Sequence, residues 1–376
     1  MANSNLTEAQ RAKNDEFYTQ YQDIEKEISA YLEYNPNVFR GKTVLLPCDD
    51  PEWSNFTKYF AQSFDRFGLK KLISTSYAHN SKNYEGVYQP TLFEFSDPQF
   101  DKNKTKKNGK IFTLSHDKTG DHKINVDDLE WHYLAGDGDF RSAEIKKLRE
   151  ESDIIITNPP FSLFREFLAW ILEARKQFVI IGNMNAITYK EVFPLLKENK
   201  AWLGPSISSG DREFQVPDSY PINAAGWRID ENGRKYLRIK GVRWFTNLDH
   251  GRRHEHIPLM TMADNLKYSK HKEIKGKKSY DRYDNYDAIE VSFTDSIPSD
   301  YGGVMGVPIS FLDKYSPDQF EIVGITDRDD NSGVKIKEYT EQDVPNYGDL
   351  NRRGVIKIGN EYKSTYARLL IKKKTI

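Results

Sequence analysis

The stretch SDIIITNPPFSLF at residues 152–164 constrains the fold of this chain more than any other segment. Three consecutive isoleucines are typical of a strand that is buried on both faces. Two consecutive prolines cannot donate backbone hydrogen bonds to a sheet, and each favours extended geometry in the residue before it. The strand must therefore end at Asn158 in a stiff turn, and the apolar residues behind the turn predict a helix.

Similar strand and helix patterns flank this segment. Apolar runs at 41–47, 69–77 and 177–183 predict buried strands, and the stretches 53–68 and 187–200 predict helices. Strand, helix, strand in this order is typical of a parallel α/β sheet with right-handed connections. The alternating stretch 235–248 predicts exposed antiparallel strands. We therefore expect a mostly parallel sheet with an antiparallel edge.

The composition narrows the classes of protein to which this chain can belong. Its 376 residues suffice for one large domain with an elaboration or for two domains, and its net charge of −1 means that nucleic acid must be met by local basic patches. The sole cysteine, Cys48, excludes an internal disulfide and a cysteine-only zinc cluster. No apolar run reaches the roughly 18 residues that a membrane span needs. We expect a soluble cytoplasmic protein.

Three loops are candidates for ligand binding, because ligands bind beyond the carboxyl ends of parallel strands. They are residues 47–50, 74–77 and 158–161, and we expect them to meet in one cleft. In the last loop, the Asn158 amide oxygen and the Pro159 carbonyl can accept the two N–H bonds of an exocyclic amine, while Phe161 offers a flat face. Two such acceptors favour a tetrahedral nitrogen whose lone pair can attack a methyl group. A strand simply ended by prolines is the alternative.

The sequence also resembles a known family. NPPF after an apolar strand resembles the catalytic motif of amino-methyltransferases that depend on S-adenosyl-L-methionine (AdoMet). Six blocks are similar, in order, to the EcoRI-type adenine-specific DNA methyltransferases: KNDEFYTQYQDIEKE (13–27), LLPCDDPEWSNFTKYF (45–60), GDGDFRS (136–142), SDIIITNPPF (152–161), VRWFTNL (242–248) and MGVPISFLDKYSPDQFEIVG (305–324). The resemblance covers most of the chain. It implies a Rossmann-like AdoMet-binding sheet and DNA adenine-N6 methylation.

The resemblance implies roles for the catalytic loop and for an N-terminal block. Within Asn158-Pro159-Pro160-Phe161, the first two residues would bind the target adenine N6, and Phe161 would stack on the flipped base. The N-terminal block resembles the motif that many adenine methyltransferases place over the methionine part of AdoMet. Its candidate residues are Asn14, Phe17, Tyr18 and Thr19. A plain amphipathic helix from Lys13 to Tyr34 is the alternative.

Two further loops are cofactor candidates by the same resemblance. Pro47-Cys48-Asp49-Asp50 stands where most methyltransferases have a glycine-rich loop, and Asp49 or Asp50 would bind the methionine amino group. Asp139 would accept a hydrogen bond from the amino group of the AdoMet adenine, and Phe140 would stack on that adenine. Solvated turns are the alternative for both loops. The acid that most relatives carry after the second strand for the ribose is missing, because Ser74–Tyr77 stands there.

The resemblance divides the chain by function. Residues 1–248 would be the AdoMet-binding and catalytic domain, with a lysine-rich insertion at about 80–130, and residues 249–376 would be the DNA target-recognition region. The partner would be double-stranded DNA. Lysine-rich segments at 101–123 and 264–283 are candidates for backbone contact, the second with Tyr268, Tyr280 and Tyr283 for stacking. HGRRHEH (250–256) indicates a phosphate-contacting or structural loop rather than a metal site.

Other functions remain open from the residues alone. The same tetrapeptide serves methylation of RNA bases and of protein glutamine side chains, and a non-catalytic DNA-binding relative could keep the fold. We expect a monomer or weak dimer with AdoMet as methyl donor, no metal and no membrane. The sequence gives neither the recognised DNA site nor a partner restriction endonuclease, because specificity depends on a few base-edge contacts.

Overall fold

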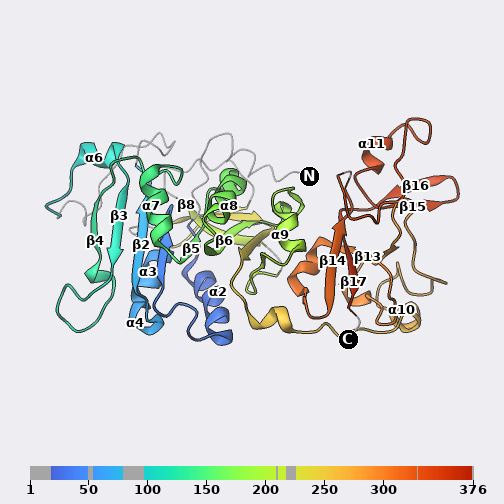
Figure 1. Ribbon diagram of the computed structural model, residues 1–376, viewed down its shortest axis with the longest axis horizontal. Coiled ribbons are helices and arrows are strands. Elements are labelled where there is room, and N and C mark those ends of the chain that lie inside the picture. Colours follow the sequence, from blue (N-terminus) through green and yellow to red (C-terminus); the bar gives the residue numbers. More distant parts are fainter. Residues whose placement is uncertain are drawn as a thin grey trace. The chain divides into compact units, whose positions relative to one another are not determined.

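The computed structural model describes residues 18–49, 54–78, 97–208, 211–216, 226–327 and 329–374. The chain divides into two compact units (Figure 1). The first unit comprises residues 1–186 and 203–250, and the second comprises residues 187–202 and 251–376. Among the residues described, none of the helices combines the length and the apolar character needed to span a lipid bilayer.

The first unit is built around an eight-stranded sheet with the order β4-β3-β2-β1-β5-β6-β11-β7. The four central strands are parallel: β2 (Lys71–Ser76), β1 (Thr43–Leu46), β5 (Ile154–Thr157) and β6 (Gln177–Asn183). On one side β3 (Lys110–Leu114) and β4 (Glu130–Tyr133) continue the sheet antiparallel; on the other, β11 (Val242–Thr246) runs antiparallel to β6 and is followed by β7 (Trp202–Leu203). The predicted Rossmann-like α/β sheet is confirmed, with antiparallel strands at both sides.

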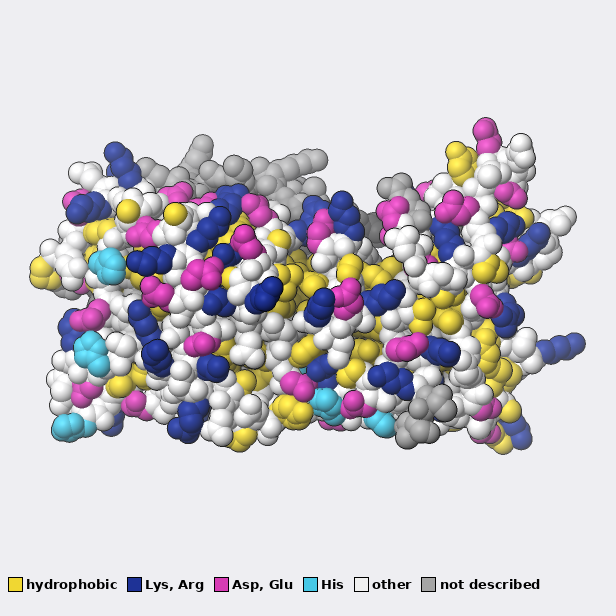
Figure 2. Space-filling view, viewed as in Figure 1, with side chains coloured by type: hydrophobic (Ala, Val, Ile, Leu, Met, Phe, Trp, Pro, Cys, Tyr) yellow, Lys and Arg dark blue, Asp and Glu magenta, His cyan; other side chains and the backbone are white. Residues whose placement is uncertain are grey.

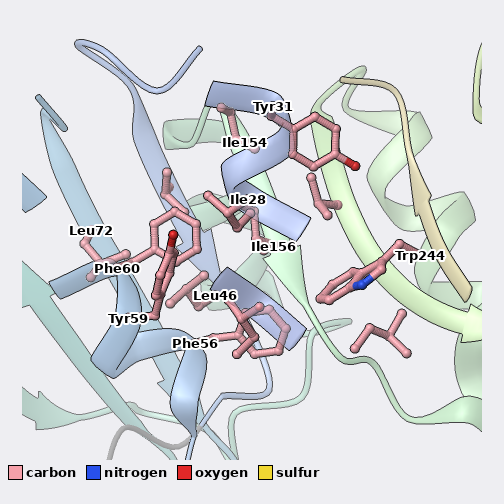
Figure 3. Packing of buried hydrophobic residues seen from close by; sticks show 14 of the residues in the cluster. Ile28, Tyr31, Leu46, Phe56, Tyr59, Phe60, Leu72, Ile154, Ile156 and Trp244 are labelled. Atoms are coloured by element: carbon pink, nitrogen blue, oxygen red, sulfur yellow. The ribbon is translucent and has the colours of Figure 1, made fainter. Parts of the chain in front are cut away.

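Helices cover both faces of this sheet. Side chains along each buried strand alternate between the two faces, so each face presents apolar side chains that a helix can cover. Leu46, Ile156 and Trp244 belong to one core cluster with side chains of α2 (Tyr21–Tyr34) and α3 (Asn55–Gln62), as Figure 3 shows. On the opposite face, Phe164 of α8 (Phe164–Glu173) packs against Phe245 of β11, with ring centroids 5.1 Å apart. Trp244 and Phe245 are neighbours in the chain, so one strand contributes to both layers.

Local sequence signals explain where several helices begin and end. Ser54 is the N-cap of α3, and its hydroxyl accepts from the backbone N–H of Phe56 at 3.1 Å. The short α4 (Phe64–Phe67) ends at Gly68, whose φ of +62° is the left-handed conformation that glycine tolerates best. Ser142 caps α7 (Ala143–Glu151), and Asp101 caps α6 (Lys102–Lys107). The helix predicted over 53–68 is therefore confirmed, with a break after Gln62.

Four predictions differ from the structure. Among the described residues, the N-terminal helix begins only at Tyr21, because Tyr18 pairs as a β-bridge with Gln215. The lysine-rich stretch 101–123, whose polar composition predicts a hairpin or loop outside the sheet core, contributes α6 and strand β3 of the large sheet. Strand β11 is fully buried rather than exposed, since it lies between β6 and β7. Of the helix predicted over 187–200, only α9 (Phe193–Lys197) is α-helical, and Pro194 stands in its first turn.

The first unit carries a second, three-stranded antiparallel sheet. Its order is β8-β10-β9, formed by β8 (Asp211–Val216), β10 (Lys235–Lys240) and β9 (Trp227–Ile229). The side chains of Phe214, Val216, Leu237 and Ile239 join the same core cluster as α2 and α3. This small sheet therefore shares its apolar core with the helical layer on one face of the large sheet.

The second unit has its own four-stranded sheet, with the order β12-β13-β17-β14. Its strands are β12 (Ile289–Glu290), β13 (Met305–Pro308), β17 (Arg368–Lys373) and β14 (Phe320–Ile325). A separate hairpin joins β15 (Val355–Ile358) to β16 (Glu361–Ser364), and the helices are α9, α10 (Met262–Tyr268) and α11 (Tyr347–Leu350). In Figure 1 the green α9 lies beside β14, although more than a hundred residues separate them in the chain.

Candidate active site

The loops after β1 and β5 are joined by one buried hydroxyl. Thr157, the last residue of β5, has no exposed surface, and its Oγ1 lies 2.6 Å from the Pro47 carbonyl and 2.6 Å from Asp49 Oδ2. One hydroxyl carries one proton, so the two acceptors share it. Thr157 directly precedes Asn158, so this contact fixes the start of the Asn-Pro-Pro-Phe turn relative to the first loop.

The ends of β1 and β2 are also tied together. The backbone N–H of Asp49 donates to the Thr75 carbonyl at 2.9 Å, and the Ser74 hydroxyl donates to the Asp49 carbonyl at 2.5 Å. The Asp49 carboxylate is buried and accepts from Ser54 Oγ at 2.8 Å as well as from Thr157. As predicted, the three strand ends therefore meet. Asp50 lies outside the described residues.

Cys48 and Tyr77 form a second link between the same two loops. The Cys48 sulfur lies 3.6 Å from the Tyr77 hydroxyl, and Cys48 has a φ of +71°. This left-handed conformation is unusual for a residue with a Cβ, and it occurs where a glycine-rich loop stands in most methyltransferases. Burial, followed by the nearby Cys48 thiol, raises the pKa of Tyr77 well above its usual value. The Tyr77 phenol therefore stays protonated.

The GDGDF loop packs against the end of β2 through a glycine. Gly138 has a φ of +88°, and a Cβ at this position would lie only 2.2 Å from the Ser76 carbonyl oxygen. The backbone N–H of Ala78 donates to the Asp137 carbonyl at 2.7 Å. Glycine at 138 is therefore required by close backbone approach. The contact brings Asp139 to the same edge of the sheet as Tyr77.

Asp139 and Phe140 both have partners within the protein. Asp139 accepts from the Arg141 backbone N–H at 2.8 Å and from its Nε at 2.9 Å, and this guanidinium lowers the pKa of Asp139. The Phe140 ring is 0% exposed and lies 5.0 Å from Phe167 and 5.7 Å from Trp170. In this structure Phe140 is a core residue, which does not support the predicted stacking on the AdoMet adenine.

The Asn158–Phe161 tetrapeptide forms an irregular turn between β5 and α8. Asn158 and Pro160 are half-buried, Pro159 is buried, and Phe161 begins a 3₁₀-helix that leads into α8. The Phe161 ring is 9% exposed and packs edge to face against Phe214 of β8, with ring centroids 6.3 Å apart. Phe161 therefore has a structural partner in addition to its predicted contact with the base.

The N-terminal block reaches this region through β8. Tyr18 exchanges two backbone hydrogen bonds with Gln215, at 2.9 and 3.0 Å, next to Phe214. The Asn55 side chain donates to the Thr19 carbonyl at 2.8 Å, which ties the block to the start of α3. Asn14 and Phe17 lie outside the described residues. The sequence analysis did not identify Phe214 as a neighbour of Phe161. Its spacing of two residues from Val216 is typical of one face of a strand and was the signal available.

The predicted basic segments contain many internal contacts. Tyr280 and Tyr283 are buried, with their hydroxyls bonded to Ser296 and Glu290, so the prediction that they stack on DNA is wrong; Tyr268 alone is exposed. On the face shown in Figure 2, Lys and Arg side chains are interspersed with Asp and Glu and form no single patch. Backbone contact by these segments stays a prediction.

Two side chains of the stretch HGRRHEH have partners within the protein. The Arg253 guanidinium lies 3.6 Å from the centroid of the Trp202 ring and donates to Asn199 at 2.6 Å, and His254 pairs with Asp318 at 2.7 Å. Within the described part of the chain, no group of three or more His, Cys, Asp or Glu side chains could hold a metal ion.

A parallel sheet whose first two strands end beside an Asn-Pro-Pro-Phe turn defines an AdoMet-dependent amino-methyltransferase of the Rossmann-like class. Carboxylate, hydroxyl and amide groups gather at that edge, and they suit the amino and hydroxyl groups of AdoMet. The chain belongs to the EcoRI family of adenine-specific methyltransferases, because the family model described as "Adenine-specific methyltransferase EcoRI" matches residues 5–374.

Curated relatives agree with this assignment. The chain is 44% identical over 331 residues to the Type II methyltransferase M.EcoRI of Escherichia coli, covering 87% of this chain and 92% of that protein. It is 32% identical over 322 residues to the Type II methyltransferase M.MpnI of Mycoplasma pneumoniae, covering 84% and 83%. No solved structure matches the chain significantly. The protein is therefore a DNA adenine methyltransferase with AdoMet as methyl donor.

Proposed function

We propose that this methyltransferase flips an adenine out of a specific site in double-stranded DNA and methylates its N6 on the Asn158–Phe161 turn. The hydrogen bonds of Thr157 carry the proposal. They hold the loop after β1 against Thr157, which directly precedes Asn158. The amino group of a stacked, paired adenine cannot be aligned with a methyl donor, so the base must leave the helix.

The catalytic loop acts by positioning the amine. The Asn158 amide oxygen and the Pro159 carbonyl accept the two N–H bonds, and the two prolines keep both acceptors in place without rearrangement. Phe161 stacks on the flipped base while Phe214 supports its ring from the side. Stacking of a base on an aromatic side chain is worth about 1–3 kcal/mol, which offsets part of the cost of extrusion.

The cofactor is held at the carboxyl edge by residues of three segments. AdoMet, when bound, supplies an electrophilic methyl group on sulfur. Tyr18 and Thr19, together with Asn14 and Phe17, contact its methionine part, and Pro47 and Cys48 line the first loop. The Asp49 carboxylate already accepts from Ser54 and Thr157, so we assign the methionine amino group to Asp50 and a supporting role to Asp49. Asp139 accepts from the adenine, with Arg141 keeping its carboxylate ionised.

We assign target recognition to the C-terminal region, as the sequence predicts. We further propose that the protein acts in the cytoplasm as a monomer or weak dimer, with or without a cognate endonuclease. The second compact unit comprises residues 187–202 and 251–376, so we assign target recognition to both of these segments. The second unit's own sheet and separate core suit a unit that varies in specificity while the catalytic sheet stays constant.

The test is to incubate the protein with genomic DNA and radiolabelled AdoMet and then to map N6-methyladenine by sequencing. We expect label at adenine in one sequence context. Parallel reactions with total RNA and with denatured protein extract test the alternatives, and label there instead of in DNA would overturn the proposal. Calorimetric titration with AdoMet compares Asp50→Asn with Asp49→Asn. We expect affinity to fall by about 1.5–3 kcal/mol for Asp50→Asn only.

A further inference from the structure

The second unit contains a cavity of about 440 Å³ that the methyl-transfer site does not use. Its wall includes residues from the 273–281 segment, from β12, and from the turn that leads from β16 into β17. Pockets of this size hold compact organic ligands in other proteins. All the lining residues are described and belong to the second unit.

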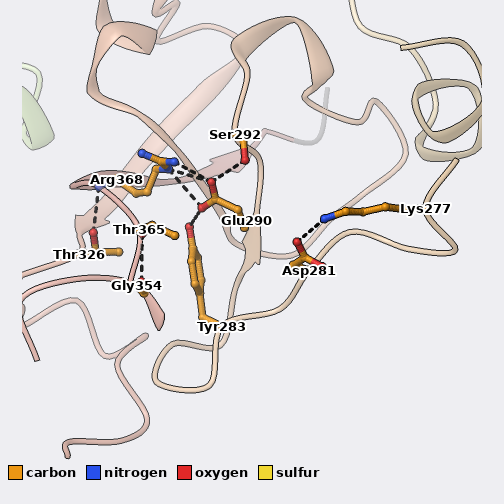
Figure 4. Close-up of polar contacts among 9 residues, drawn as sticks. All are labelled: Lys277, Asp281, Tyr283, Glu290, Ser292, Thr326, Gly354, Thr365 and Arg368. Carbon is orange, nitrogen blue, oxygen red and sulfur yellow. Dashed lines mark hydrogen bonds and ion pairs between the residues drawn. The ribbon is translucent and has the colours of Figure 1, made fainter. Parts of the chain in front are cut away.

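An arginine fixed by a buried carboxylate forms part of this wall (Figure 4). Arg368 Nε lies 3.0 Å and Nη2 lies 2.8 Å from Glu290 Oε1, and the two side chains are only 11% and 5% exposed. Glu290 also accepts from the Ser292 hydroxyl at 2.8 Å and from the Tyr283 hydroxyl. Burial, followed by the charge of Glu290, raises the pKa of Tyr283, so this phenol remains a donor.

The geometry leaves one edge of the guanidinium available to a ligand. A guanidinium has five N–H bonds, and Nε and Nη2 each use one toward Glu290. Both Nη1 hydrogens and the second Nη2 hydrogen make no hydrogen bond in the described structure, and Figure 4 shows one nitrogen of Arg368 pointing away from Glu290. Nη1 and Nη2 together form a fork that matches two adjacent acceptors in one plane.

The charges around the cavity favour a neutral group inside it, such as a base, over a phosphate group. Three basic residues line it, and so do three acidic ones: Lys277, Lys363 and Arg368 against Glu273, Asp281 and Glu290. Two of these pairs neutralise each other, because Lys277 contacts Asp281 at 2.5 Å and Arg368 contacts Glu290. Polyanion sites carry a clear basic excess, and this wall has none.

Aromatic surface at the cavity suits a flat ligand. Tyr366 lines the cavity with 85% of its surface exposed, in a protein whose large apolar side chains are mostly buried. An exposed ring is a platform for stacking a base. Guanine presents O6 and N7 as two adjacent acceptors and an amino group as donor, whereas adenine replaces the O6 acceptor by a donor. The Arg368 fork matches the guanine edge that carries O6 and N7, and the Glu273 carboxylate can accept from the guanine amino group.

We propose that this cavity binds an unstacked guanine base, with Arg368 donating to O6 and N7, Glu273 accepting from the opposite edge, and Tyr366 stacking on the ring. The base comes either from the DNA substrate or from a free guanine nucleotide, because both present the same chemistry. The proposal does not depend on the catalytic assignment in the first unit, since binding is measured without methyl transfer.

The test is calorimetric titration of the full chain with guanosine 5′-monophosphate while S-adenosylhomocysteine saturates the cofactor site. We expect binding about tenfold or more tighter than for adenosine 5′-monophosphate. The 7-deaza analogue of the guanine nucleotide lacks the N7 acceptor and should lose most of that preference. Equal affinity for the three nucleotides, or no binding at millimolar concentration, would overturn the proposal.

Variants locate the binding. Tyr366→Ala and Glu273→Gln change exposed side chains and should fold; each should weaken guanine binding several-fold, whereas Tyr347→Ala, an exposed tyrosine outside the cavity wall, should not. The double variant Arg368→Gln/Glu290→Gln removes the fork without leaving a buried charge unpaired and should abolish the guanine preference. Unchanged guanine binding in Tyr366→Ala, in Glu273→Gln and in the double variant would contradict the assignment. Competition by a single-stranded oligonucleotide with one guanine identifies DNA as the source, and its absence identifies the free nucleotide.

Discussion

Replacing Thr157 by valine tests whether the hydroxyl between the two loops couples cofactor binding to catalysis. Valine keeps the branched shape but removes the hydroxyl that donates to the buried Pro47 carbonyl and Asp49 Oδ2, each 2.6 Å from Oγ1. Leaving one buried acceptor without its donor costs about 1–3 kcal/mol. For a unit of this size the cost corresponds to a Tm decrease of roughly 2 to 12 °C.

The catalytic effect should exceed what lost stability explains. Without the hydroxyl, the first loop and the Asn158 turn can shift independently, and misplacement by an ångström can cost about 100-fold in rate. We expect kcat to fall about tenfold or more at saturating DNA and AdoMet, at a temperature where the variant is fully folded. Single-turnover transfer of radiolabelled methyl groups measures the chemical step directly.

A matched control separates the two effects. Thr246 in β11 is also fully buried, and its hydroxyl donates to the Phe178 carbonyl at 2.7 Å, away from the strand ends that carry the site. Thr246→Val should lower Tm by a comparable amount and leave kcat nearly unchanged, while Thr157→Ser, which keeps a hydroxyl, should restore most of the rate. Equal rates in the Thr157→Val and Thr246→Val variants would refute the coupling.

Three shorter predictions concern other parts of the site. Asn158→Ala should slow methyl transfer on the order of 100-fold or more while AdoMet affinity in calorimetry stays within a factor of two or so; a near-normal rate would remove Asn158 from the mechanism. Phe161→Ala should brighten 2-aminopurine placed at the target base and slow methylation, and a lack of both effects would make Phe161 a core residue only. Gly138→Ala should lower Tm in thermal unfolding, because the new Cβ would meet the Ser76 carbonyl at 2.2 Å; an unchanged Tm would contradict the close approach.

The central strands could be predicted from sequence because burial on both faces leaves uninterrupted apolar runs. β5 (Ile154–Thr157) ends directly before Asn158, as predicted, and β6 (Gln177–Asn183) coincides with the predicted run 177–183. The meeting of the strand ends followed from parallel topology alone. In β11, the alternation of Arg243 with its apolar neighbours indicated an exposed strand, but the arginine is buried and donates to backbone carbonyls. One of these carbonyls belongs to Ser208, which is distant in the chain, so no local pattern indicates it.

Two contacts near the site that sequence reasoning did not predict join residues that are distant in the chain. Tyr18 leaves the helical pattern because Gln215, far along the chain, offers its backbone groups. Phe140 was expected at the ligand, but Phe167 and Trp170 of α8 enclose it. Both outcomes require knowing which elements pack together, and residue types in a local window do not contain that information.

The strand order of the second unit has a consequence for how the protein is made. β17 follows every other strand of its sheet in the chain, yet it lies between β13 and β14. A ribosome must therefore synthesise residues 368–373 before this sheet can close, and until then β13 and β14 each have an unpaired edge open to aggregation. Premature stop codons that remove only these last residues should abolish the whole unit, and with it the arginine at position 368.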